Sequence, residues 1–104
     1  MTIEVNKENF EQNKSNNNLF VIDVWTTTCT SCKTYSPIFE SVSDQHEDVV
    51  MGKMDGMVNR DIAAEYSIRS VPTTLFLKGG VLLEKKVGPL TSKELNETIN
   101  KLKS

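Results

Sequence analysis

A buried strand that leads directly into a pair of cysteines limits the fold of this chain more strongly than any other feature. Residues 19–25 form an apolar run of strand length, rich in β-branched and aromatic residues and interrupted only by Asp23. Cys29 and Cys32, the only cysteines, follow within a short turn. From Cys32 to Val42, apolar residues recur at spacings of three and four, which is typical of a helix with one buried face. The segment therefore predicts a strand, a dithiol turn and a helix.

The two cysteines are candidates for thiol chemistry. Two thiols separated by two residues can close a small disulfide ring. At a helix N-terminus, exposed backbone N–H groups and the positive end of the helix dipole favour a thiolate. Cys29 is therefore the candidate nucleophile, and Cys32, one turn inside the helix, is the candidate resolving thiol. Pro37 lies farther along the same helix, where we expect a kink and not an end.

Length, charge and hydropathy exclude several classes of function. The 104 residues are enough for one core, so residues 1–104 are predicted to form a single domain. A formal net charge of -2, without a cluster of Lys or Arg, gives no field that would attract nucleic acid. No apolar run approaches the roughly 20 residues that span a bilayer, and residues 1–4 lack the basic start of a signal peptide. We therefore expect a cytoplasmic protein that binds neither nucleic acid nor membrane.

The cysteine count also bears on metal binding. In a reducing cytosol, a close cysteine pair is more typical of redox chemistry or metal binding than of a structural disulfide. A structural zinc site needs four protein ligands and a catalytic one needs three, and the pair together with the single His46 completes neither set. His46 lies in a polar, acidic context and is expected at the surface. In an alternative, two chains share one metal ion or cluster through paired Cys29 and Cys32.

The rest of the chain alternates between strand and helix patterns. Strands are predicted at residues 2–5, 49–55, 73–77 and 81–87, the last two joined by a tight turn at Gly79 and Gly80. Helices are predicted after Asn6 as N-cap, at residues 59–67, and after a capping box at residues 91–94. The polar run at residues 13–18 is expected to be a loop. This order indicates an α/β fold with a central mixed sheet of about five strands flanked by four helices.

Several landmarks in a fixed order give the chain a resemblance to the thioredoxin family that covers nearly its whole length. A buried aspartate lies six residues before the first cysteine, and a tryptophan lies two residues after that aspartate. A lysine follows the second cysteine, and a helix-kinking proline comes after it. A strand lysine, a cis-proline segment and two glycines complete the set. In this chain the landmarks are Asp23, Trp25, Cys29, Cys32, Lys33, Pro37, Lys53, Val71-Pro72-Thr73, Gly80 and Gly88.

The resemblance implies a thioredoxin fold and the activity of a protein-disulfide reductase. Cys29 and Cys32 would cycle between dithiol and disulfide, with no bound cofactor and no metal. A carboxylate in an apolar strand is costly unless it is paired or protonated, and the resemblance implies that Asp23 carries a proton for Cys32. Lys53, if buried nearby, would hold Asp23 ionised more readily.

The same resemblance implies a substrate-binding surface around the dithiol. Pro72 is expected to follow a cis peptide bond and to pack against the cysteines, which leaves the backbone of Val71 open to pair with an extended substrate segment. Trp25 is expected beside the active-site turn. The full set of predicted substrate-binding residues is Trp25, Thr28, Thr30, Ser31, Val71, Pro72 and Gly88.

The residues around the cysteines depart from the family pattern. Family members usually carry Trp-Cys-Gly-Pro-Cys, whereas residues 28–32 are Thr-Cys-Thr-Ser-Cys. Ser31 in place of the proline adds a backbone N–H and a hydroxyl beside the sulfurs, and either can alter the balance between thiolate and disulfide. An isomerase or oxidant is therefore an alternative to a reductase, and a binding module without redox chemistry is another.

The expected partners follow from the resemblance alone. Electrons would come from a flavin-dependent thioredoxin reductase that uses NADPH, or from a dedicated reductase adapted to Thr28, Thr30 and Ser31. Substrates would be oxidised proteins, and the chain would serve electron transport and cell redox homeostasis. We expect it to act as a monomer.

Overall fold

Five strands and four helices alternate along the part of the chain that the computed structural model describes, residues 1–16 and 18–103. The strands are β1 (Ile3–Glu4), β2 (Leu19–Trp25), β3 (Val50–Asp55), β4 (Thr73–Lys78) and β5 (Val81–Val87). The helices are α1 (Lys7–Lys14), α2 (Thr30–Ser43), α3 (Arg60–Glu65) and α4 (Ser92–Lys103). This is the predicted order of elements, so the expected α/β architecture is confirmed.

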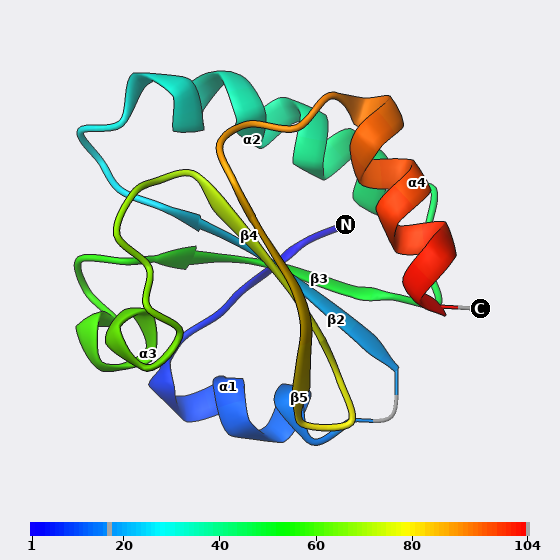
Figure 1. Cartoon of the computed structure of the whole chain (residues 1–104), viewed down its shortest axis with the longest axis horizontal. Helices are drawn as coiled ribbons and strands as arrows, with labels where there is room; N and C mark the ends of the chain where they lie inside the picture. The colour runs from blue at the N-terminus through cyan, green and yellow to red at the C-terminus, as the bar shows by residue number, and fades with distance from the viewer. Residues whose placement is uncertain (17, 104) are drawn as a thin grey trace.

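One mixed sheet with β2 at its centre organises the fold (Figure 1). The strand order is β1-β3-β2-β4-β5; β1, β3 and β2 run parallel, and β4 is antiparallel to both β2 and β5. Helices α2 and α4 cover one face of the sheet, and α1 and α3 lie on the other (Figure 1). Because β2 has a strand on each side and a helix layer on each face, its sequence is almost continuously apolar.

β2 contributes to both hydrophobic cores, because its side chains alternate between the two faces of the sheet. The core beneath α2 and α4 includes Leu19, Val21, Tyr35, Phe39, Val42, Met51, Phe76, Leu95 and Ile99. The core beneath α1 and α3 includes Val5, Phe10, Phe20, Ile22, Val24, Met54, Ile62, Leu75 and Leu77. Both helix layers are therefore anchored to the same central strand.

Side-chain caps fix the starts of the first and last helices, as predicted. Asn6 Oδ1 accepts hydrogen bonds from the backbone N–H groups of Glu8 and Asn9, each at 3.0 Å. At the start of α4, Thr91 Oγ1 accepts from the backbone N–H of Glu94 at 3.1 Å, and the Glu94 carboxylate accepts from the backbone N–H of Thr91 at 2.9 Å. Each such cap contributes about 1 kcal/mol to stability.

The polar run that we expected to be a loop belongs partly to α1, so its predicted start is wrong. Asn13 and Lys14 are helical. Asn13 Nδ2 donates to the carbonyl oxygen of Asn9 at 2.9 Å, and the Lys14 ammonium lies 5.7 Å from the centre of the Phe10 ring. These contacts within the helix outweigh the low helix propensity of asparagine. Residue 17 of the predicted loop lies outside the described residues.

Helix α3 ends slightly before its predicted end near Ser67, and α2 continues past its internal proline. α3 ends at Glu65 and not at residue 67, because Ser67 has a φ of 54°, a left-handed conformation through which a helix does not continue. α2 continues through Pro37 as far as Ser43, as we expected.

His46 is buried, which contradicts its predicted place at the surface. It is 5% exposed, and its two ring nitrogens both have partners on α4. The Lys103 ammonium can only donate, so it donates to Nδ1 at 2.9 Å, and Nε2 donates to Asn96 Oδ1 at 2.7 Å. The polar residues next to His46 in the sequence could not reveal this burial, because the partners are 50 and 57 positions away.

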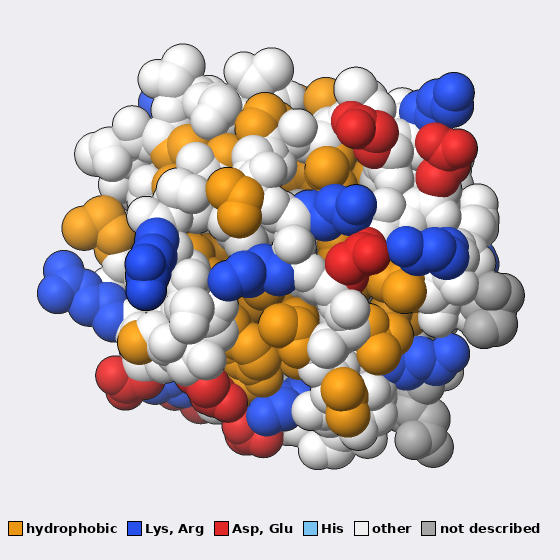
Figure 2. Space-filling view, viewed as in Figure 1, with side chains coloured by type: hydrophobic (Ala, Val, Ile, Leu, Met, Phe, Trp, Pro, Cys, Tyr) orange, Lys and Arg blue, Asp and Glu red, His pale blue; other side chains and the backbone are white. Residues whose placement is uncertain are grey.

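The last strand, β5, forms one edge of the sheet and carries exposed apolar side chains. Val81, Leu83 and Val87 are 58%, 43% and 65% exposed and alternate with less exposed neighbours. Figure 2 shows the molecule in the same view as Figure 1, with β5 toward the viewer. The hydrophobic side chains on this face are interspersed with Lys and Arg, so charge divides the apolar surface (Figure 2).

The close approach of β1 to β3 depends on Gly52. A Cβ at this position would overlap Val5 Cγ2 and lie 3.1 Å from the carbonyl oxygen of Ile3. We therefore expect Gly52→Ala to destabilise the protein by about 1 to 3 kcal/mol, because the first strand must move outward. Urea unfolding would measure the loss. The Val5→Ala change removes the overlapping methyl group, so the double variant should lose less than the sum of the two single changes. Equal stability of Gly52→Ala and wild type would contradict this account.

Candidate functional site

Strand alternation places a carboxyl group beneath α2. Val21 packs on the α2 side of the sheet, so Asp23, two residues later, faces the same side near the end of β2. Met51 and Lys53 repeat this relation on β3, and Lys53 is the Cα partner of Asp23 in the β2–β3 pair. Thr74 is the partner of Asp23 in the β2–β4 pair. Asp23 is therefore flanked by a lysine and a threonine, on the sheet face that α2 covers.

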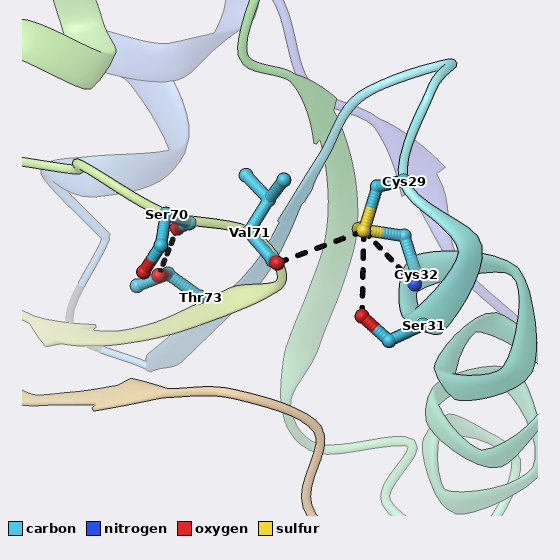
Figure 3. Close-up of a disulfide and its surroundings, with 6 residues drawn as sticks. All are labelled: Cys29, Ser31, Cys32, Ser70, Val71 and Thr73. Atoms are coloured by element: carbon cyan, nitrogen blue, oxygen red, sulfur yellow. Dashed lines mark hydrogen bonds between the residues drawn. A yellow bond between two sulfur atoms is a disulfide. The ribbon is translucent and has the colours of Figure 1, made fainter.

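The two cysteines are joined by a disulfide at the start of α2 (Figure 3). Cys29 is the N-cap residue, and its Sγ accepts a hydrogen bond from the backbone N–H of Cys32 at 3.1 Å. The Ser31 hydroxyl lies 3.5 Å from the same sulfur and is the donor, because a disulfide sulfur carries no proton. Cys32 is 3% exposed, whereas Cys29 is half-buried. Two donors therefore point at the more accessible sulfur of the pair.

The loop before β4 lies against the disulfide. The Val71–Pro72 peptide bond is cis, and the Val71 carbonyl oxygen points toward Cys29, 3.6 Å from its Sγ (Figure 3). The backbone N–H of Gly88, which has a φ of 94°, donates to the Pro72 carbonyl oxygen at 2.8 Å. These contacts bring residues that are far apart in the sequence to one side of Cys29.

The remaining predicted site residues border the same region. Thr28 and Thr30 are exposed on either side of Cys29 in the sequence. Trp25 lines a cavity of about 520 Å³ whose walls also include Cys32 and Lys53. The residues that the sequence predicts for the site therefore lie around the disulfide, or on the strands and cavity walls next to it.

Sequence reasoning missed two residues that contact Lys53. Its Nζ donates to Ser36 Oγ at 2.6 Å and lies 3.6 Å from Glu40 Oε1. Ser36 and Glu40 are four residues apart on α2, a spacing that places two side chains on the same face of a helix. This spacing was visible in the sequence, but the packing that brings these two side chains to Lys53 was not.

Asp23 is buried without a polar partner. It is 1% exposed, and within residues 1–16 and 18–103 neither carboxylate oxygen has a hydrogen-bond partner. Burial raises the pKa of Asp23 from its ordinary value of 3.8 to about 7, and the charge of Lys53 opposes this rise. The carboxyl group can therefore gain or lose a proton near neutral pH, which suits a group that exchanges protons with a thiol.

Two findings bear on metal and membrane binding. Among the residues that the structure describes, no three or more His, Cys, Asp or Glu side chains are grouped so that they could hold a metal ion. None of the described helices is long and apolar enough to cross a membrane.

The site combines a helix that begins at a disulfide, a cis-proline loop beside it and a titratable carboxyl group in the adjacent strand. This combination is typical of proteins that catalyse thiol–disulfide exchange. The thioredoxin family model matches residues 1–101. The chain belongs to the thioredoxin family.

Individual relatives agree with this assignment. The chain is 36% identical to a thioredoxin of Buchnera aphidicola over 100 residues, which cover 94% of this chain and 93% of the relative. It is 32% identical to a thioredoxin of Listeria monocytogenes over 102 residues, which cover 97% and 98%. The crystal structure of Malassezia sympodialis thioredoxin (Mala s 13) superposes with a TM-score of 0.92 at 30% identity, over 100% of this chain and 92% of that one. Sequence and structure thus lead to the same family.

The raised pKa of Asp23 predicts how stability depends on pH. The unfolded carboxyl group ionises near pH 4 and the folded one near pH 7, so the folded state loses stability as pH rises between these values. We expect Asp23→Ala to stabilise the oxidised protein more at pH 8 than at pH 4, by on the order of 4 kcal/mol. Urea unfolding at the two pH values measures this difference, with the exposed Asp61→Ala as control. A gain that is the same at both pH values would contradict the prediction.

Proposed function

We propose that this thiol–disulfide oxidoreductase reduces disulfides in partner proteins through a reversible cycle of Cys29 and Cys32. The observation that carries the proposal is the position of Cys29, at the N-terminus of α2 with two hydrogen-bond donors to its sulfur. These donors and the helix dipole favour the thiolate when the pair is reduced, and the thiolate is the nucleophile in disulfide exchange. Membership of the thioredoxin family supports the direction of reduction.

The reaction follows two exchanges. The Cys29 thiolate attacks one sulfur of the substrate disulfide, and the other substrate sulfur leaves as a thiolate. Cys32 then gives its proton to the Asp23 carboxylate and attacks Cys29 Sγ, which forms the Cys29–Cys32 disulfide and releases the second substrate sulfur. The substrate gains two electrons, and the dithiol of this chain is oxidised. Lys53, on the neighbouring strand, tunes the ionisation of Asp23.

The substrate would bind across the surface beside Cys29. Val71 is half-buried, and its backbone would pair with an extended segment of the substrate. The hydrogen bond from the Gly88 N–H to the Pro72 carbonyl oxygen supports this proposal, because it ties the loop to the end of β5. Trp25, which lines the cavity beside Cys32, would contribute an apolar contact. Exposed Thr28, Thr30 and Ser31 would contact the substrate where relatives usually carry a tryptophan, a glycine and a proline.

Further proposals concern the setting of this chemistry. Thioredoxins receive electrons from thioredoxin reductase and act on oxidised proteins, and we propose a flavin- and NADPH-dependent reductase, generic or dedicated, for this chain. A close dithiol suits the reducing environment of the cytoplasm, which is the compartment that we propose. Because β2 supplies both cores, we also propose that residues 1–104 act as a single domain. We propose that this domain acts as a monomer.

Exchanging each cysteine tests the division of roles. We expect Cys29→Ser to reduce insulin disulfides no faster than the uncatalysed reaction, because the attacking thiolate is gone. Cys32→Ser keeps the attacking thiolate but cannot resolve, so it should accumulate a mixed disulfide that non-reducing electrophoresis detects. A Cys29→Ser protein with wild-type turnover, or a mixed disulfide formed through Cys32, would show that the assignment is wrong.

Replacing Ser31 tests how the Thr30-Ser31 dipeptide affects the reduction potential. The Ser31 hydroxyl lies 3.5 Å from Cys29 Sγ in the disulfide, and we propose that it donates more strongly to the thiolate of the reduced pair, so Ser31→Ala should lower the reduction potential by roughly 10 to 30 mV. Thiol trapping in glutathione buffers measures both proteins, and Ser41→Ala, on the exposed side of α2, serves as control. An unchanged potential would contradict the proposed stabilisation of the thiolate by Ser31. A wild-type value near roughly -180 mV, and not near roughly -270 mV, would favour isomerase activity over reduction.

A further inference from the structure

Lys53 does not form the ion pair that its position in the sheet favours. Its Cα partner across the β2–β3 pair is Asp23, and both side chains lie on the face covered by α2. Yet Lys53 Nζ donates to Ser36 Oγ at 2.6 Å and lies 3.6 Å from Glu40 Oε1. Among the described residues, both carboxylate oxygens of Asp23 remain without a hydrogen-bond partner. The Lys53 ammonium is therefore held by residues of α2 and not by Asp23.

Glu40, the charged partner of Lys53 on α2, is itself held in place. Thr2 Oγ1 donates to Glu40 Oε1 at 2.8 Å, and the Thr2 backbone N–H donates to Oε2 at 3.1 Å. The Ser43 hydroxyl lies 3.3 Å from Oε2, and the amino group of Met1 lies 4.0 Å from it. These hydrogen bonds, with that of the Thr2 hydroxyl first, and the charge of Lys53 lower the pKa of Glu40. Glu40 therefore stays ionised at neutral pH and keeps its attraction for Lys53.

The position of Lys53 matters for Asp23 because a cation in direct contact stabilises a carboxylate. An opposite charge within about 4 to 6 Å lowers the pKa of a carboxyl group by about 1 to 3 units. A Lys53 ammonium bound directly to Asp23 would therefore keep the carboxyl group ionised throughout the neutral range. With its ammonium shared between Ser36 and Glu40, Lys53 opposes the effect of burial without cancelling it.

We propose that Ser36 and Glu40 are positioning residues that hold the Lys53 ammonium away from Asp23, so that the buried carboxyl group can exchange a proton with Cys32. This inference rests on the proposed function, in which Asp23 carries that proton. Thr2 takes part by orienting the Glu40 carboxylate. The residues involved come from three segments of the chain: the start of the chain, α2 and β3.

The other groups around Asp23 do not supply a competing charge. Tyr35 on α2 and Thr74 on β4 hydrogen-bond to each other through their hydroxyl groups at 2.8 Å, and both are buried. Burial raises the pKa of Tyr35, so its hydroxyl group stays neutral at physiological pH. Cys32 is the thiol that exchanges the proton, and Lys53 is the charge that lowers the pKa of Asp23.

Titration of Asp23 in a double-mutant cycle tests the inference. In the oxidised protein neither cysteine titrates, so the carboxyl carbon signal of Asp23 in an NMR titration reports its ionisation without interference from the thiols. The four proteins are wild type, Glu40→Gln, Lys53→Met and the double variant. We expect Glu40→Gln to lower the titration midpoint of Asp23 by about one pH unit, because Lys53 can then approach the carboxylate. The same change should have no effect in the Lys53→Met background.

Matched controls separate this effect from a general change in charge. Glu97→Gln, an exposed position on α4, removes the same charge and should leave the midpoint unchanged. Ser36→Ala should lower the midpoint in the same direction as Glu40→Gln, and Ser41→Ala should not. An unchanged midpoint in Glu40→Gln overturns the proposal, and so does an equal shift with and without Lys53, which would indicate a direct effect of the Glu40 charge. An unchanged midpoint in Ser36→Ala removes Ser36 from it.

The pH dependence of turnover provides a second readout. The pH at which insulin reduction by Glu40→Gln is half-maximal should shift in the same direction as the Asp23 midpoint, whereas a merely structural role for Glu40 would lower the rate equally at every pH. Failure of the proposed function would appear differently, as a wild-type protein that does not reduce disulfides although its Asp23 titrates as expected. A shifted Asp23 midpoint with an unshifted pH profile overturns the link to proton exchange.

Discussion

The burial of an unpaired carboxyl group in the central strand is the constraint on which the rest of the site depends. Such a group is costly, and a strand can hold it only where neighbouring strands and helices exclude water and pack tightly. β2 meets this condition because it has a strand on each side and a helix layer on each face. The two cores therefore do more than stabilise the fold: they create the environment that moves the ionisation of Asp23 to neutral pH.

Different elements supply the separate requirements of the chemistry. The N-terminus of α2 provides the backbone donor that favours a thiolate at Cys29. β2 and β3 provide the carboxyl group and the lysine to which we assign the handling of a proton. The loop before β4 provides the carbonyl group of Val71 beside the sulfur. No single segment could supply all three, so the site depends on the relative placement that the mixed sheet gives to them.

The local features of this chain were predictable from sequence, because their causes are local. The apolar run at residues 19–25 became β2 with the same bounds, and the capping residues Asn6 and Thr91 act as expected. Features that depend on contacts between distant segments were not. His46 is buried by residues of α4 that are 50 or more positions away.

For the candidate site, the residues were easier to predict than their contacts. A resemblance to a family indicates which positions are candidates for the chemistry, and the structure places the Val71 carbonyl oxygen, next to Pro72, against Cys29 Sγ. The resemblance could not show which acceptors the Lys53 ammonium contacts. It contacts Ser36 and Glu40, which lie near β3 because of the way α2 packs on the sheet.

The two edges of the sheet have a consequence for self-association. An edge strand offers unpaired backbone groups to any second copy of the chain, and proteins counter this with short edge strands or with lysine in them. Here β1, at one edge, has only two residues, which is too short to template another strand. β5, at the other edge, is long and partly apolar, but Lys85 and Lys86 interrupt it. Each edge is thus protected by a different device, and the reactive disulfide can meet partner proteins without sheets joining edge to edge.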